Sequence, residues 1–226
     1  MSKIISPFHG VFFDLDGTLA DTAPDLVAAT NQLLVARNLA PKPYELLRPH
    51  ASAGARGLLE GAFGIGPDHA DFAALRDEFF SNYENALLVE SKLFDGIGHL
   101  LDQMDSAQLP WGIITNKSKR FTNPLTDLMG LSQRAVSTVS GDTTAHSKPH
   151  PGPILFAART ASIDPTKSIY VGDDIRDVIA GKAAGMKTVA AAYGYCGCKE
   201  PPEAWGADYI INNPLELLQI IFPNKV

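Results

Sequence analysis

The chain has 226 residues, which is enough to bury a full core in one or two domains, and its 45% hydrophobic and 19% charged residues are typical of a globular enzyme. A formal net charge of −6 argues against nucleic acid or an anionic membrane as the partner. Residues 1–5 lead into no signal-peptide pattern, and no apolar run is long enough to span a bilayer. We therefore expect a cytoplasmic protein, and the sequence favours no particular oligomeric state.

The first predicted element is a buried strand. The apolar run 11–13 is rich in β-branched and aromatic residues, and two carboxylates, Asp14 and Asp16, follow it directly. Because side chains alternate along an extended segment, both carboxylates point to the same side if that geometry persists. Two like charges this close are unfavourable unless a cation or a shared proton intervenes. An Asp-Gly turn that merely ends a strand would leave the same residues without a function.

Helical patterning follows from residue 24 to about residue 88, with almost no strand signal. Thr22 and Asp25 have the spacing of a capping box, which predicts the start of the first helix. Two further helices are predicted over residues 56–63 and 71–87. From residue 94 onward, strands and helices alternate at the spacing of βαβ units.

This alternation predicts an α/β fold with a parallel sheet flanked by helices. The simplest layout assigns residues 1–21 and 92–226 to the sheet domain. Residues 22–91 then form a helical insert between the first strand and the remainder of the sheet.

Polar residues follow the later predicted strands as well. The apolar runs 111–114 and 169–171 each lead into such residues, and a lysine comes shortly after the run 136–140: Thr115, Asn116, Lys148, Asp173, Asp174 and Asp177. In an open α/β sheet, ligands bind beyond the carboxyl ends of the strands. We therefore expect these side chains to meet Asp14 and Asp16 at one edge of the sheet.

In this order, four segments resemble the motifs of the haloacid dehalogenase-like (HAD) phosphatases: Asp14-Leu-Asp-Gly-Thr18, Thr115-Asn116, Lys148-Pro149, and Gly172-Asp173 with Asp177. The resemblance covers nearly the whole chain. It implies a Rossmann-like core and identifies the helical insert as a C1-type cap over the active site. Within the family the chain resembles the phosphoglycolate phosphatase group. It is most similar there to the N-acetylmuramic acid 6-phosphate phosphatase branch, through segments 111–117, 172–177, 193–195 and 205–208.

The resemblance implies that Asp14 is the nucleophile and forms an aspartyl-phosphate, chemistry that a positioned carboxylate can perform. It implies that Asp16 protonates the leaving oxygen and then activates the hydrolytic water. Mg²⁺ would be held by Asp14, by the backbone carbonyl of Asp16 and by Asp173, and oxygen ligands suit this ion. Lys148 would balance charge between the nucleophile and the phosphoryl oxygens.

Other motif residues have supporting roles in this reading. Thr18, Thr115 and Asn116 are expected to bind phosphate. The resemblance places Asp177 just outside the metal ligands, holding metal-bound water, with Asp174 beside it. Asp173 and Asp177 could instead only cap the helix that follows, and Asp174 could also cap it.

The segment 52–57, rich in small residues, resembles the substrate-specificity loop of the cap. Its arginine, Arg56, is our candidate for gripping a substrate carboxylate in bidentate fashion. Both 2-phosphoglycolate and N-acetylmuramic acid 6-phosphate carry such a group. A solvated surface arginine is the alternative interpretation.

The two cysteines, Cys196 and Cys198, are separated by one glycine. Two thiols cannot complete a zinc site alone, and in a reduced cytosol we expect both to be free.

We therefore expect a Mg²⁺-dependent phosphatase acting on a small phosphorylated metabolite, either 2-phosphoglycolate or N-acetylmuramic acid 6-phosphate. A β-phosphoglucomutase-like phosphotransferase would share the Asp14/Asp16 pair. A receiver-type signalling module also combines acidic residues with Thr and Lys, but it is shorter and carries its acceptor on a later strand. A kinase is disfavoured because no GxxxxGK[ST] loop is present.

Overall fold

A computed structural model describes residues 6–223 of the chain. Its main sheet has the strand order β5-β4-β1-β6-β7-β8, and every neighbouring pair is parallel. The strands are β1 (Gly10–Phe13), β4 (Trp111–Ile114), β5 (Thr138–Val139), β6 (Ser168–Gly172), β7 (Lys187–Ala191) and β8 (Tyr209–Ile211). The predicted α/β fold with a parallel sheet is confirmed.

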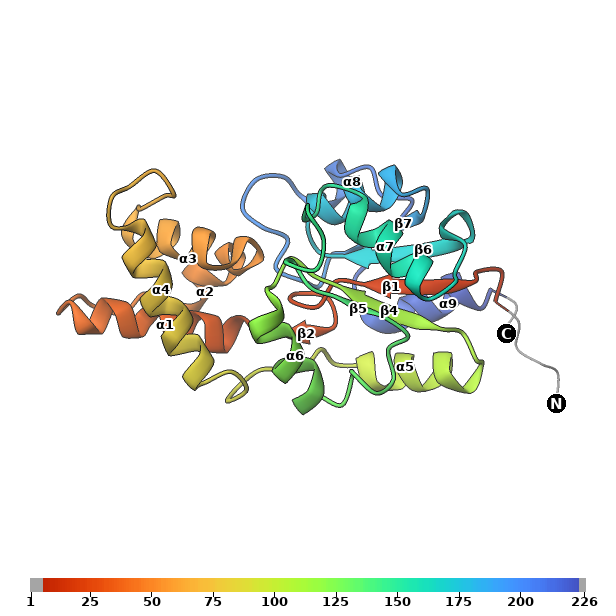
Figure 1. The fold of residues 1–226 in the computed structure, drawn as a ribbon, viewed down its shortest axis with the longest axis horizontal. Coiled ribbons are helices and arrows are strands. Elements are labelled where there is room, and N and C mark those ends of the chain that lie inside the picture. The colour runs from red at the N-terminus through yellow and green to blue at the C-terminus, as the bar shows by residue number, and fades with distance from the viewer. Residues whose placement is uncertain (1–5, 224–226) are drawn as a thin grey trace.

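Helices cover both faces of this sheet (Figure 1). One face packs against α5 (Ile97–Ser106), α6 (Lys119–Leu128) and α9 (Leu217–Ile221), and the other against α7 (Gly152–Thr160) and α8 (Ile175–Ala183). The side chains of strand β1 alternate between the two faces of the sheet and therefore pack against both helix layers. Val11 and Phe13 join the first cluster of buried residues, whereas Phe12 joins the second.

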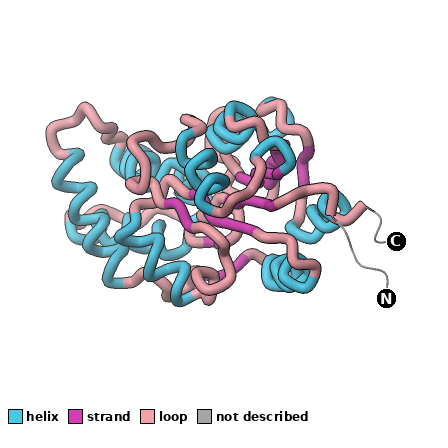
Figure 2. Tube along the Cα trace, turned by 45° about the vertical axis from the view of Figure 1, so that its right-hand side comes forward, coloured by secondary structure: helices cyan, strands magenta, loops and turns pink. Residues whose placement is uncertain are grey.

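The insert folds as a separate group of helices beside the sheet, seen at the left of Figure 1 and in cyan in Figure 2. It comprises α1 (Ala23–Ala36), α2 (Tyr44–Leu47), a 3₁₀ helix (Arg48–Ala53), α3 (Gly54–Phe63) and α4 (Phe72–Asn85). These helices share their own cluster of buried residues, into which Phe121 and Tyr195 reach from the sheet domain. The two helices predicted at 56–63 and 71–87 are therefore confirmed as α3 and α4.

A small antiparallel ribbon joins the two parts of the molecule. Strand β2 (Ala20–Asp21) pairs with β3 (Lys92–Leu93), so the chain leaves the sheet domain and returns to it at one place. Each strand has two residues, which is too short for an alternation signal in the sequence. We propose residues 22–91 as the cap domain, with this ribbon at its base.

The capping box expected at Thr22 and Asp25 is wrong, although α1 begins where it was predicted. Thr22 occupies the N-cap position, but its oxygen accepts no backbone N–H of the helix, and its hydroxyl donates to Asp16. The buried Asp25 carboxylate accepts hydrogen bonds from the backbone N–H groups of residues 89–91. Asp25 thus ties the returning linker to the first helix of the cap.

Among residues 6–223, no helix is both long and apolar enough to cross a membrane. Cys196 is partly buried and Cys198 is exposed, and both are free thiols as expected.

Candidate active site

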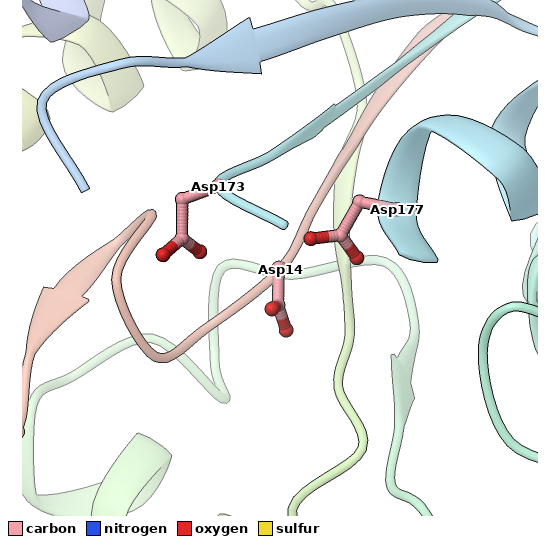
Figure 3. A group of neighbouring side chains, drawn as sticks. All are labelled: Asp14, Asp173 and Asp177. Atoms are coloured by element: carbon pink, nitrogen blue, oxygen red, sulfur yellow. The ribbon is translucent and has the colours of Figure 1, made fainter. Parts of the chain in front are cut away.

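Three carboxylates converge where the central strands end. Asp14 follows β1, Asp173 follows β6, and Asp177 lies in the first turn of α8. Because Phe13 pairs with Val171 in the neighbouring strand, Asp14 lies level with Gly172, the residue before Asp173. One oxygen from each of the three carboxylates lies within 4.8 Å of the others. Figure 3 shows the side chains turned toward a common space.

Lys148 is the cation that faces this cluster. Its ammonium lies 2.9 Å from Asp14 Oδ1 and 2.7 Å from Asp177 Oδ1, and its side chain is almost completely buried. It also donates to the Ile114 carbonyl and to the Tyr170 hydroxyl. Although burial alone lowers the pKa of a lysine, Asp14 and Asp177 raise the pKa of Lys148 above its ordinary value. Lys148 therefore remains charged and fixed at the position where the sequence predicted it.

Asp14 is held so that one of its oxygens stays available. Oδ1 accepts the backbone N–H of Leu15 and faces the Lys148 ammonium, whereas Oδ2 has no hydrogen bond to any residue in 6–223. Burial is the largest cause that raises the pKa of Asp14 to about 7, with further increases from Asp177 and Asp16 and an opposing effect of Lys148. A neighbouring cation is needed to keep this group a nucleophilic carboxylate below that pH.

Asp173 is buried in a tight cradle of backbone. Its Oδ1 accepts the Thr18 hydroxyl and its Oδ2 accepts the Tyr195 N–H. Gly17 has φ +82°, and a Cβ at that position would lie 2.1 Å from Asp173 Oδ2, so glycine is required for this close approach. Burial, followed by the charges of Asp14 and Asp177, raises the pKa of Asp173 well above its ordinary value.

The structure gives Thr18 a different position from the phosphate contact expected from the sequence. Thr18 is completely buried, and its hydroxyl donates to Asp173 rather than facing the cavity. We therefore propose that Thr18 orients an aspartate of the metal site.

Asp16 is held by partners other than those of the acidic trio. Its Oδ1 accepts the Thr22 hydroxyl and lies 2.9 Å from the Lys117 ammonium, and its Oδ2 has no hydrogen bond within residues 6–223. The Lys117 side chain is largely buried, which by itself lowers the pKa of the lysine, but the combined effects of Asp16 and Tyr83 raise that pKa above its ordinary value. Lys117 lies in the recognised segment 111–117 but was not predicted as a site residue, because 101 positions separate it from Asp16.

Thr115 and Asn116 have separate tasks at the end of β4. The Thr115 Oγ1 accepts the Lys117 N–H, which leaves its own proton free for a phosphate oxygen. The Asn116 side chain accepts the backbone N–H of Lys148 and donates to the carbonyl of the same residue. Asn116 thus positions the lysine loop with its side chain, which differs from the phosphate contact that was expected.

Asp174 and Asp177 form a capping box at the start of α8. The Asp174 carboxylate accepts the Arg176 N–H, and Asp177 Oδ2 accepts the Asp174 N–H. Asp177 also faces Lys148 from within the acidic cluster. Asp174 therefore bonds to the helix and to the cap and lies outside the acidic cluster. Asp177 both caps the helix and faces Lys148 within the acidic cluster.

A cavity of about 350 Å³ lies between these residues and the cap. Asp14, Asp16, Thr115 and Lys148 line its inner end. The cap side contributes aromatic side chains and two arginines: Phe72, Phe79, Phe80, Tyr83, Arg56 and Arg76. Arg56 is exposed at the rim and makes no hydrogen bond with a residue in 6–223, so its predicted position beside a substrate fits the structure.

The cluster has the ligands and the charge that a hard divalent cation requires. Asp14, Asp173 and Asp177 offer only oxygen atoms, which Mg²⁺ prefers. When Asp16 is included, four carboxylates face two lysines, Lys117 and Lys148, and the two excess negative charges equal the charge of one such cation. Residues of this chain therefore fit a Mg²⁺ ion, and Asp14 and Asp173 would hold it.

The raised pKa of Asp14 predicts how the folding stability of the metal-free protein depends on pH. A folded-state pKa of about 7 at Asp14, above the reference value of 3.8, means that the folded state binds more protons between these limits. Stability therefore falls as the pH rises through about 7, and a cation bound by the carboxylates offsets the loss. We expect Mg²⁺ to raise the melting temperature more at pH 8 than at pH 5, and less in Asp14→Asn. An increment that is equal at both pH values would contradict this.

Comparisons with known proteins agree with this geometry. The sequence-family model of the haloacid dehalogenase-like hydrolases matches residues 11–191 of this chain. An N-acetylmuramic acid 6-phosphate phosphatase of Pseudomonas putida is 41% identical over 213 residues, which cover 94% of this chain and 96% of that protein. A phosphoglycolate phosphatase of Xanthomonas campestris pv. campestris is 41% identical over 212 residues, which cover 92% of this chain and 94% of that protein.

The same fold occurs in solved structures. A crystal structure described as a predicted phosphoglycolate phosphatase from Haemophilus somnus has a TM-score of 0.84 at 25% identity, and the match covers 95% of this chain and 98% of that chain. CbbY from Rhodobacter sphaeroides, in complex with phosphate, has a TM-score of 0.73 at 21% identity, over 93% of this chain and 96% of that chain. The latter likeness shows the fold alone.

Proposed function

This chain belongs to the haloacid dehalogenase-like hydrolase family, and from that premise we propose that it is a Mg²⁺-dependent phosphatase acting through an aspartyl-phosphate. The observation that carries the proposal is the convergence of Asp14, Asp173 and Asp177 with Lys148 at one end of the cavity. Phosphoryl transfer needs a positioned nucleophile, neutralised phosphoryl oxygens and a proton for the leaving oxygen. Residues of this chain can supply each of these.

We assign the nucleophile to Asp14 Oδ2. Its partner oxygen is fixed by the Leu15 N–H and by Lys148, so the free oxygen is aimed without further reorganisation. Attack on phosphorus forms the Asp14–phosphorus bond and breaks the bond from phosphorus to the ester oxygen. Lys148 and the free proton of the Thr115 hydroxyl can stabilise the charge on the phosphoryl oxygens.

Asp16 is our candidate for the proton transfers. Asp16 lines the cavity and its Oδ2 has no hydrogen bond within residues 6–223, while Lys117 and Thr22 fix Oδ1. In the first step Asp16 gives a proton to the departing alkoxide, and in the second it takes one from the water that attacks the aspartyl-phosphate. The presence of this carboxylate suits esters, whose leaving oxygen needs a proton.

A bound Mg²⁺ would supply positive charge that lets a phosphate dianion approach this acidic site. We propose Asp14, Asp173 and the backbone carbonyl of Asp16 as its protein ligands. Asp177 faces the same space and is fixed by Lys148 and by the Asp174 N–H. This position suits Asp177 to hold water bound to the ion.

For the substrate we propose an amino-sugar phosphate with a carboxylate, namely N-acetylmuramic acid 6-phosphate, with 2-phosphoglycolate as the second candidate. The cavity of about 350 Å³ lies at the lower end of the range of roughly 300–1,000 Å³ that is typical of sites for ligands larger than a two-carbon acid. Phe72, Phe79 and Phe80 offer apolar surface for a sugar ring and an acetyl methyl group. We propose that Arg56 binds the carboxylate.

The experiment that tests this function is a phosphate-release assay with four esters. These are N-acetylmuramic acid 6-phosphate, N-acetylglucosamine 6-phosphate, 2-phosphoglycolate and glucose 6-phosphate, each measured with Mg²⁺ and with EDTA. We expect the highest kcat/KM with the first ester and no turnover in EDTA. N-acetylglucosamine 6-phosphate is the matched control, because it differs by the lactyl ether that carries the carboxylate.

Other outcomes would each reject a defined part of the proposal. A higher kcat/KM for 2-phosphoglycolate would replace the substrate and keep the phosphatase. Conversion of a hexose phosphate to its isomer, with little free phosphate, would favour the β-phosphoglucomutase-like alternative. A long-lived phosphorylated protein without turnover would favour the receiver-type alternative, and activity that persists in EDTA would reject the role of Mg²⁺.

A further inference from the structure

The cap touches the sheet domain through a polar contact that none of the roles above uses. Ser52, in the 3₁₀ helix before α3, donates its hydroxyl to Asp174 Oδ2 at 2.5 Å. In return, Arg176 Nη2 of the sheet domain donates to the Ser52 carbonyl at 2.7 Å. Both the side chain and the backbone of one cap residue are thus bonded to the start of α8. We call Ser52, Asp174 and Arg176 the clasp.

Arg176 is rigidly held within the clasp. Its Nε lies 2.7 Å from Asp174 Oδ1, and its Nη2 lies 2.8 Å from Asp174 Oδ2, which gives a bidentate pair. Asp174 is fixed in turn because its carboxylate caps α8 through the Arg176 N–H. The third guanidinium nitrogen, Nη1, has no hydrogen bond to any residue in 6–223. The position of the guanidinium is therefore set by the helix that also carries Asp177.

The clasp lies directly beside the residues that would meet the substrate. Ser52, Arg56, Asp174 and Arg176 all line the cavity whose inner end holds Asp14. Asp174 follows Asp173 in sequence, so the contact joins the loop of the proposed metal site to the substrate loop 52–56. Within residues 6–223, the other polar tie near this loop runs from Arg48 to the carbonyls of Tyr193 and Gly194.

We propose that Arg176 is a positioning residue that holds the substrate loop 52–56 over the acidic cluster, so that recognition of the non-phosphate part of the substrate depends on it. The proposal rests on the proposed phosphatase function. Without Arg176 the Ser52 carbonyl loses its partner, and the loop keeps one bond to Asp174 from the Ser52 hydroxyl. Arg176 does not contribute to the atoms assigned to phosphoryl transfer, so the chemistry on a minimal ester remains.

The test compares two esters in three variants. The esters are the preferred substrate from the assay above and p-nitrophenyl phosphate, which has neither a carboxylate nor sugar hydroxyls. Arg176→Ala keeps the backbone N–H that Asp174 caps, and Ser52→Ala removes one clasp donor. Arg159→Ala is the matched control, because Arg159 is exposed on α7, lies over the Phe156 ring, and its side chain makes no hydrogen bond or ion pair within residues 6–223.

We expect Arg176→Ala to raise KM for the preferred substrate by about tenfold or more, since a factor of ten corresponds to the loss of one or two hydrogen bonds. The KM for p-nitrophenyl phosphate and both kcat values should change by less than about threefold. Ser52→Ala should have a smaller effect of the same kind. Hydrogen exchange supplies a readout without turnover, and amides of the loop should exchange faster in Arg176→Ala, whereas those of α4 should not.

Equal changes of KM for both esters, or unchanged exchange of the loop amides, would overturn the positioning role. Failure of the proposed function would look different, because the wild-type protein would then release no phosphate from any ester while the exchange experiment could still be read.

Discussion

Asp14→Asn should lower kcat for phosphate release by a factor on the order of 10⁴ or more, which is the scale observed when a nucleophile is removed. An amide at this position can still accept the Leu15 N–H, but it cannot attack phosphorus as an anion. The substitution also removes one of the carboxylates that crowd the site, so the fold should be retained or stabilised. Steady-state phosphate release with Mg²⁺ and thermal unfolding measure the two effects.

Asp68→Asn is the matched control for this variant. It makes the same chemical change at an exposed cap residue whose side chain makes no hydrogen bond within residues 6–223, and it should leave both kcat and the melting temperature unchanged. Activity of Asp14→Asn near that of the wild type would remove Asp14 from the nucleophile role. A collapse of its folded structure would show instead that the carboxylate is needed for stability.

Lys148→Met should affect both activity and stability. Lys148 bridges Asp14 and Asp177, and methionine leaves these two buried carboxylates facing each other without a cation. Loss of one partner from a buried ion pair costs about 3–5 kcal/mol, and we expect a decrease of that size in the free energy of unfolding, measured by urea in EDTA at pH 8. Turnover should fall about 10³-fold, since charge stabilisation at the phosphoryl oxygens is also lost.

The decrease in stability should shrink at lower pH, because protonation of Asp14 relieves the repulsion, and loss of Lys148, which lowers the pKa of Asp14, makes that protonation easier. The matched control is Lys119→Met, since Lys119 is exposed on α6 and has no ion pair among the described residues. If Lys148→Met unfolds with the same free energy as the wild type, the lysine does not hold the acidic cluster together. If it also keeps full turnover, Lys148 has no role in the reaction.

The sequence contains enough information to predict the sheet and the residues at its carboxyl edge. Parallel strands end at one edge, so polar residues that follow β1, β4 and β6 must lie close together once the strand order is right. The convergence of Asp14 with Asp173 follows from this rule alone. The helical insert is equally visible, because its helical spacing contrasts with the alternating strands and helices that follow.

Side-chain partners were harder to predict where they depend on tertiary contact. Thr22 had the local pattern of a helix cap, but its hydroxyl donates to Asp16 and its oxygen accepts no backbone N–H of the helix. Lys117 lies in a segment that was recognised, yet its partner Asp16 is 101 positions away. Likewise, Ser52 and Asp174 are 122 positions apart, and no local spacing links them.

Thr18 and Asn116 show a different difficulty. Both lie in motifs that were identified correctly, but the motif does not say which neighbour each side chain will choose. Thr18 bonds Asp173 and Asn116 bonds the backbone of Lys148, so both support site residues where direct contact with phosphate was expected. A recognised motif therefore indicated which residues lie near the candidate site better than it indicated which partner each side chain contacts.

The most direct measurement is to quench the protein with acid during turnover and to locate the phosphoryl group by mass spectrometry of peptides. Phosphate on the peptide that contains Asp14, absent in Asp14→Asn and absent when EDTA is present, is the expected result. A phosphoryl group found on another residue, or none at all while a rapid quench captures an early burst of product, would contradict nucleophilic attack by Asp14.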